Sequence, residues 1–116
     1  DIVEKAYDLS HQCSMLPDYV KRIYPEIENM PKNAMGKSMA GTAFESTLYL
    51  ASGMTDLSYA MLGDFDEPLS FYEEGFALFS AHNAYWKRLA KVSEKSKDGG
   101  ICFAESKKVR QLHGEQ

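Results

Sequence analysis

Apolar side chains recur in steps of four and three positions through residues 2–30, and this spacing constrains the fold more than any other feature. The series runs without a slip through Ile2, Ala6, Leu9, Cys13, Leu16, Val20, Ile23, Ile27 and Met30. Such steps place apolar side chains along one narrow seam of an α-helix. The spacing therefore predicts a long helix over residues 2–30 whose seam is covered by partner helices.

Two prolines, Pro17 and Pro25, interrupt this predicted helix. A proline inside a helix removes a backbone hydrogen bond at a cost of about 3 kcal/mol. The helix is therefore either kinked or broken at Ser14, which would then cap a second helix and leave Pro17 in its first turn. Because the heptad phase continues across both prolines, we expect a kinked helix.

Two further long helices are predicted after the connection 31–33. Asn33 is a candidate N-cap for a helix over residues 34–62 that stops at Gly63. Ser70 and Glu73 have the spacing of a capping box for a third helix that extends to Lys97. No alternating pattern typical of strands is found.

The predicted fold class is all-α, an elongated antiparallel three-helix bundle with a proline-kinked first helix and a short C-terminal tail. The bundle spans residues 1–100, and the tail, residues 101–116, forms a short helix or frays because it has little apolar surface to bury. A chain of 116 residues with 44% apolar content fits one folded domain.

The two cysteines, Cys13 and Cys102, form no C-x-x-C motif, which argues against a zinc ribbon or a disulfide-rich scaffold. We expect two reduced thiols and a cytoplasmic location. A single disulfide between them, and a leader peptide already removed, are the alternatives. No stretch of eighteen apolar residues predicts a membrane span.

The second predicted helix is nearly free of charge. Between residues 35 and 63 the only charged side chains are Lys37, Glu45 and Asp56. An outer helix normally turns a charged face to water, so we expect self-association or a docked partner to cover this one. The alternatives are a tail that folds back over it, or a face wetted by serine and threonine. The predicted partner-binding residues on this helix are Phe44, Leu48 and Ala51.

The third predicted helix is rich in aromatic residues. Most of them recur at helical spacing and belong in a core. Tyr85 and Trp86 are adjacent and point about 100° apart, so both cannot lie at the centre of one seam. Tryptophan and arginine are enriched at interface hot spots. The predicted partner-binding residues on this helix are Tyr72, Phe79, Trp86 and Arg88.

Eight of the 13 lysine and arginine residues follow residue 86, although the whole chain carries a net charge of −4. Cations at the end of a helix complement its dipole, and a patch of them also attracts an anionic membrane surface. Nucleic acid is not an expected partner, because no reading motif accompanies the charge. The candidate anion-binding residues are Lys87, Arg88, Lys91, Lys95, Lys107, Lys108 and Arg110.

No motif predicts catalysis, a cofactor or a metal. Residues 31–38 resemble the end of a phosphate-binding loop, but Pro31 replaces its first glycine and no predicted strand precedes it. In an antiparallel bundle Glu45 and His82 would lie near the middle of their helices but His11 toward one end of its own, and no Glu-x-x-His motif occurs. We expect His82 in the core, hydrogen-bonded to a hydroxyl such as that of Thr47.

The sequence therefore predicts a non-catalytic helical interaction or scaffold module that associates with itself or with a partner's helix. Two alternatives stay open. One is a carrier of a small apolar ligand or lipid, in which methionines and aromatic side chains line a cavity between the helices. The other is peripheral binding to a membrane surface through the basic end.

Overall fold

A computed structural model of the chain describes residues 2–28, 36–62 and 66–94. The described part is mostly helical, as predicted, and also contains a pair of short parallel strands. In chain order the elements are α1 (Ile2–Ser14), β1 (Glu26–Glu28), α2 (Met39–Ala51), β2 (Ser58–Ala60), the 3₁₀ helix η1 (Leu69–Tyr72) and α3 (Glu73–Ser93).

The first helix is shorter than predicted and is not kinked. α1 ends at Ser14, where the Leu16 N–H donates to the Cys13 carbonyl at 3.1 Å in a tight turn. Pro17 follows this turn, and no helix restarts before β1. The expected kinked helix was therefore wrong. The alternative break at Ser14 is confirmed, but the second helix that Ser14 would cap is not formed. The regular spacing of apolar residues continues past the end of α1 because later residues of the series also pack into the core. The fully buried Ile27, for example, contacts the same core cluster from a strand.

The strands β1 and β2 pair in parallel, with Ile27 beside Tyr59. The segments that precede the two strands are also hydrogen-bonded to each other and hold the strands side by side. The Ile23 N–H donates to the Thr55 hydroxyl at 2.8 Å, and the Thr55 N–H donates to the Ile23 carbonyl at 3.1 Å. The prediction of a strand-free chain was wrong. Strands of three residues are too short to show an alternating pattern in the sequence.

The second helix is also shorter than predicted. Ser38 caps α2, since its hydroxyl accepts from the Gly41 N–H at 3.0 Å. The helix ends at Ala51, and Gly53 then adopts a φ of +96°, a conformation that favours glycine and stops a helix. The predicted cap at Asn33 and stop at Gly63 lie outside the described residues.

The third helix agrees best with its prediction. α3 begins at Glu73 after the one-turn η1 and continues to Ser93. Its predicted end at Lys97 and the predicted tail, residues 101–116, lie outside the described residues.

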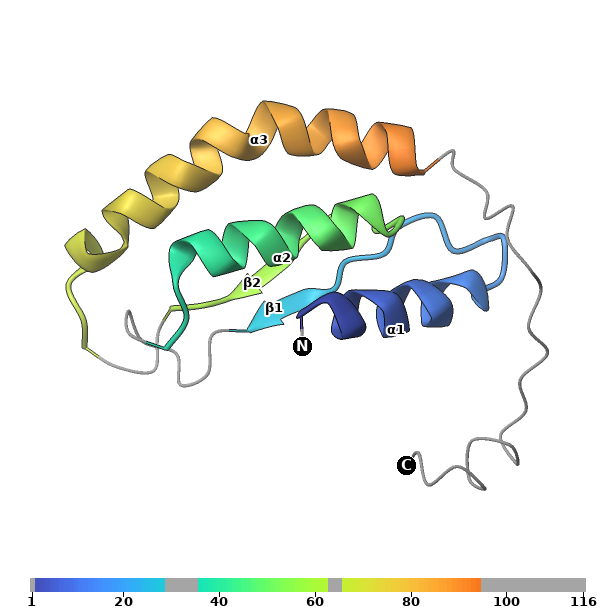
Figure 1. Cartoon of the computed structure of the whole chain (residues 1–116), viewed down its shortest axis with the longest axis horizontal. Helices are drawn as coiled ribbons and strands as arrows, with labels where there is room; N and C mark the ends of the chain where they lie inside the picture. Colours follow the sequence, from blue (N-terminus) through green and yellow to red (C-terminus); the bar gives the residue numbers. More distant parts are fainter. Residues whose placement is uncertain (1, 29–35, 63–65, 95–116) are drawn as a thin grey trace, which may run out of the picture.

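The three helices run parallel to one another, so the predicted antiparallel bundle was wrong in direction (Figure 1). Contacts between successive parts of each helix establish this direction. Lys5 and Cys13 of α1 contact Glu45 and Met54, in the same order along the chain. Met39 and Thr47 of α2 lie against Gly75 and Trp86 of α3, again in the same order. Each strand lies between two helices in the chain and runs in the opposite direction to them. The helix after a strand therefore runs in the same direction as the helix before it.

α2 is the middle helix and has a core cluster on each side (Figure 1). On the α1 side, Ala6, Ile27, Tyr49 and Met54 pack together. On the α3 side, Ala43, Leu50 and Trp86 form the second cluster. The two-stranded sheet lies against one side of this helical layer, with Ile27 and Tyr59 directed toward the helices and the two glutamates of β1 exposed. The opposite, outer side of the layer is left uncovered by the described residues.

The parallel packing of α2 on α3 predicts a close contact at Gly75. A Cβ added there would lie 2.6 Å from the Met39 Cγ. We expect Gly75→Ala to lower the free energy of unfolding by at most about 1 kcal/mol, because the flexible end of Met39 can move and alanine favours a helix over glycine by about 1 kcal/mol. In a Met39→Ala background the same change should cost much less, because the space is free. Urea denaturation of the four variants measures this coupling, and additive effects would contradict the contact.

Candidate functional site

The only charged residue of α2, Glu45, is buried and turned away from solvent. Its side chain is 1% exposed. The Tyr49 hydroxyl donates to Oε1 at 2.6 Å, the Lys5 ammonium lies 3.5 Å from the same oxygen, and the Lys37 ammonium pairs with Oε2. Two cations and a phenol therefore satisfy a carboxylate that would otherwise be costly to bury.

The electrostatics of this cluster keep Glu45 ionised. Burial raises the pKa of the Glu45 carboxyl, but the hydrogen bonds from Lys37 and Tyr49 and the charges of Lys37 and Lys5 outweigh burial, so the pKa is lowered overall. Burial and the bond to Glu45 together raise the pKa of Tyr49 well above its usual range. Lys37, which the sequence placed in a remnant of a phosphate-binding loop, is an ion-pair partner here.

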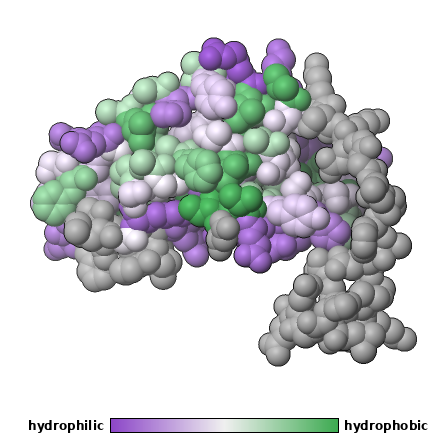
Figure 2. All heavy atoms as spheres, in the orientation of Figure 1, coloured by the Kyte–Doolittle hydropathy of each residue, from purple (hydrophilic) through white to green (hydrophobic). Residues whose placement is uncertain are grey.

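Because Glu45 faces α1, the outer side of α2 carries no charge. Phe44, 52% exposed, and Ala51 lie on this outer side, with Leu48 half-buried beside them. Figure 2 shows apolar residues gathered across the middle of the molecule on the face that looks outward from the helices. These are the three residues of α2 that the sequence predicted as partner-binding, and the structure brings them together on one face.

α3 extends the same apolar surface. Leu78, Tyr85 and Leu89 are spaced by seven and four positions and so share one side of the helix. Leu78 and Leu89 are half-buried against α2, and Tyr85 is 45% exposed. We call the residues Phe44, Leu48 and Ala51 of α2 and Leu78, Tyr85 and Leu89 of α3 the interaction face. The three residues from α3 were not predicted to bind a partner, because helical spacing alone does not show which side of α3 packs against α2.

Four of the seven predicted partner-binding residues lie elsewhere, and three of these four pack the fold. Tyr72 is buried and donates its hydroxyl to Glu67. Trp86, 8% exposed, donates its indole N–H to the Thr47 hydroxyl at 2.9 Å. Phe79 is half-buried and stacks on Tyr59 with ring centroids 5.3 Å apart. These side chains pack the fold and do not belong to the interaction face.

The basic residues of α3 are exposed but not gathered with that face. Arg88 projects from the side of α3 opposite the helix packing, and Lys87 and Lys91 are also exposed. The other candidate anion-binding residues, Lys95, Lys107, Lys108 and Arg110, lie outside the described residues.

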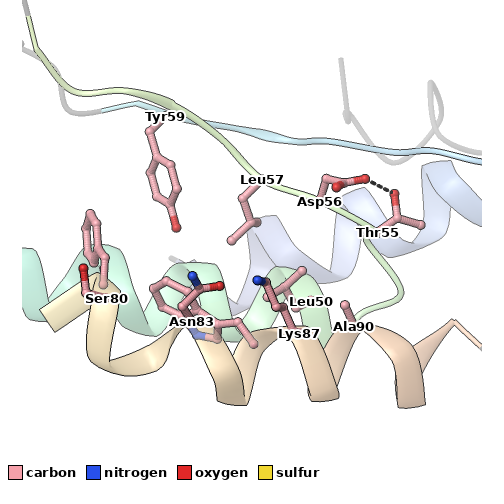
Figure 3. A pocket seen from close by; sticks show the side chains of 11 residues that line it. Leu50, Thr55, Asp56, Leu57, Tyr59, Ser80, Asn83, Lys87 and Ala90 are labelled. Atoms are coloured by element: carbon pink, nitrogen blue, oxygen red, sulfur yellow. Dashed lines mark hydrogen bonds between the residues drawn. The ribbon is translucent and has the colours of Figure 1, made fainter. Parts of the chain in front are cut away.

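A groove of about 400 Å³ lies on the other side of α3, next to the sheet (Figure 3). Its apolar lining consists of Leu50, Leu57, Phe79, Trp86 and Ala90. The polar ends of Asn83 and Lys87 project into it, and neither side chain has a hydrogen-bond or ion-pair partner in the described part of the chain. No sequence pattern predicted this groove, because it depends on how the segment 55–59 lies against α3.

In the described part of the chain, Cys13 and His82 make structural contacts. Burial raises the pKa of the Cys13 thiol, which disfavours a reactive thiolate. The Nδ1 atom of His82 lies 2.8 Å from the Leu78 carbonyl of its own helix, so its predicted bond to a hydroxyl of α2 was wrong. Within the described ranges, no three metal-ligating side chains cluster, and no helix is both long and apolar enough to cross a bilayer.

Comparison with models of protein families, with curated proteins and with solved structures found no match to this chain.

The Glu45 cluster makes the stability depend on acid pH. Since the pKa is lower in the folded chain than the ordinary value of about 4.3, ionised Glu45 stabilises the fold above that pH, and the stabilisation is lost as pH falls through the folded pKa. We expect Glu45→Gln to lower the free energy of unfolding at pH 7 by about 1–3 kcal/mol. This deficit should shrink below about pH 4.

Chemical denaturation at several pH values measures this effect. Glu26→Gln, on the exposed side of β1, is the matched control and should change the free energy of unfolding little. A deficit for Glu45→Gln that stays constant from pH 7 to acid would contradict the role of its charge.

Proposed function

We propose that this chain is a non-catalytic protein-interaction module and that it associates through the interaction face. The observation that carries the proposal is the uncharged outer side of α2, which results from the inward orientation of Glu45. A contiguous apolar surface that stays exposed on a small protein is typical of a binding site.

The partner that this face fits best is a second copy of the chain. The face has neither acidic nor basic members, so two copies can approach about a two-fold axis without placing like charges opposite one another. Exposed aromatic rings such as Phe44 and Tyr85 provide large contact areas with few rotatable bonds. A helix from a different protein, with an apolar stripe of its own, is the alternative partner.

The self-association predicts a dimer that a single buried charge disrupts. We expect Ala51→Glu to raise the Kd by about 100-fold or more, because the new carboxylate would be buried without a partner. Ala84→Glu, the same change at an exposed position on the far side of α3, is the matched control and should leave the Kd unchanged. Sedimentation equilibrium and native mass spectrometry over micromolar concentrations measure both.

Two results would contradict this proposal. A chain that stays monomeric at several hundred micromolar would exclude self-association and leave only a different partner. Equal effects of the two glutamate substitutions would show that association uses another surface.

The two alternative functions stay predictions. A small apolar ligand would lie in the groove beside Trp86, where much of the lining is apolar and Lys87 offers an ammonium. Binding of an anionic membrane surface would use the exposed cations Lys87, Arg88 and Lys91. Neither alternative explains the uncharged outer side of α2.

A further inference from the structure

We propose that the groove beside α3 binds a small, flat aromatic carboxylate, with the ring against the apolar wall and the carboxylate on Lys87 and Asn83. This inference narrows the alternative function of ligand binding to one chemical class. It does not depend on the interaction face, which is formed by other residues of α2 and α3.

The groove has the size of a site for a small molecule. Its volume of about 400 Å³ lies toward the lower end of the range for ligand pockets. The segment 55–59 forms one wall and α3 forms the other, as Figure 3 shows. A molecule with one or two fused rings therefore fits between two walls that belong to distant parts of the chain.

Three aromatic rings in the wall are held in place by contacts with other side chains. The hydroxyls of Tyr59 and Ser46 are hydrogen-bonded at 2.9 Å, and Tyr59 stacks on Phe79 with ring centroids 5.3 Å apart. Trp86 donates its indole N–H to the Thr47 hydroxyl at 2.9 Å. Because these rings are already ordered, a ligand loses less entropy on binding. Rings also attract one another beyond the area that they bury, which favours a flat aromatic ligand.

Lys87 and Asn83 supply the polar contacts of the groove. They are four positions apart and so share one side of α3. Figure 3 shows the polar ends of both side chains directed into the groove. Neither has a hydrogen-bond or ion-pair partner in the described part of the chain. An ammonium and an amide N–H are donors that a carboxylate accepts strongly.

The charge of the lining favours an anion over a cation. Among the described residues of the lining, the one carboxylate is that of Asp56. It accepts from Arg22 Nη2 at 3.0 Å and Nε at 3.2 Å, and from the Thr55 hydroxyl at 2.9 Å. Arg22 therefore balances Asp56, and the charge of Lys87 is left to attract an anionic ligand.

The test compares an acid with its neutral amide on the full chain. Indole-3-carboxylate and indole-3-carboxamide are titrated separately into the ¹⁵N-labelled protein. Trp86 is the only tryptophan, so its indole N–H signal is unambiguous and reports on the groove wall. We expect saturable shifts with a Kd of about 1 mM or tighter for the carboxylate. The carboxamide should bind about fivefold more weakly, because it lacks the ion pair.

Two substitutions test the contact with the ammonium. Lys87→Gln should raise the Kd of the carboxylate about fivefold and leave that of the carboxamide nearly unchanged. Arg88→Gln, the matched control, removes a neighbouring cation that does not line the groove and should change neither Kd appreciably. Both positions are exposed, so we expect both variants to fold. Equal effects of the two substitutions would overturn the proposal.

Nuclear Overhauser effects locate the bound ring independently of the affinity. Ring protons of indole-3-carboxylate should show them to the methyl groups of Leu50 and Leu57, which line the groove. Contacts to the methyl groups of Leu48 and Leu78 instead would place the ligand on the interaction face and overturn the proposal. The absence of saturable binding up to about 5 mM would also overturn it. Neither result would bear on dimer formation, which is measured without ligand.

Discussion

The buried ion cluster around Glu45 is the interaction on which the rest of the arrangement depends. It joins α1, through Lys5, to the middle of α2 and ties the segment before α2 to the same carboxylate through Lys37. Without these partners an ionised carboxylate could not stay in the interior. Because they are present, α2 turns its one charge inward, and the outer side of the helix remains apolar. The core and the interaction face thus share one cause.

The short strands have an effect out of proportion to their size. β1 and β2 contain three residues each, yet they reverse the chain between helices and make all three helices parallel. This direction places Trp86 against Thr47 in the interior and leaves Tyr85 beside the outer side of α2. It also carries α3 beyond β2, over the groove. With direct turns between helices, other side chains of α3 would meet α2.

The seam at residues 2–30 shows why a regular pattern can mislead. Its first members, such as Ala6 and Cys13, do lie on the core side of α1. Ile23 and Ile27 pack against the same cluster from an extended segment. Their spacing in the sequence matches a helical repeat only by coincidence. Pro17 and Pro25 were the better guide, since a helix interior tolerates neither. For α3, where no proline intervenes, the pattern predicted the helix well.

The sequence by itself determined that the chain is mostly helical, that residues 73–93 belong to a helix, and that α2 lacks the charged face of a solvated helix. These properties follow from local composition and from the spacing of residues within one element. Tertiary structure alone decided that Glu45 is buried, that the helices are parallel, and which side of α3 joins Phe44 on the interaction face. Each of these depends on residues far apart in the chain, and the strand pairs and ion pairs that bring them together leave no periodic signal.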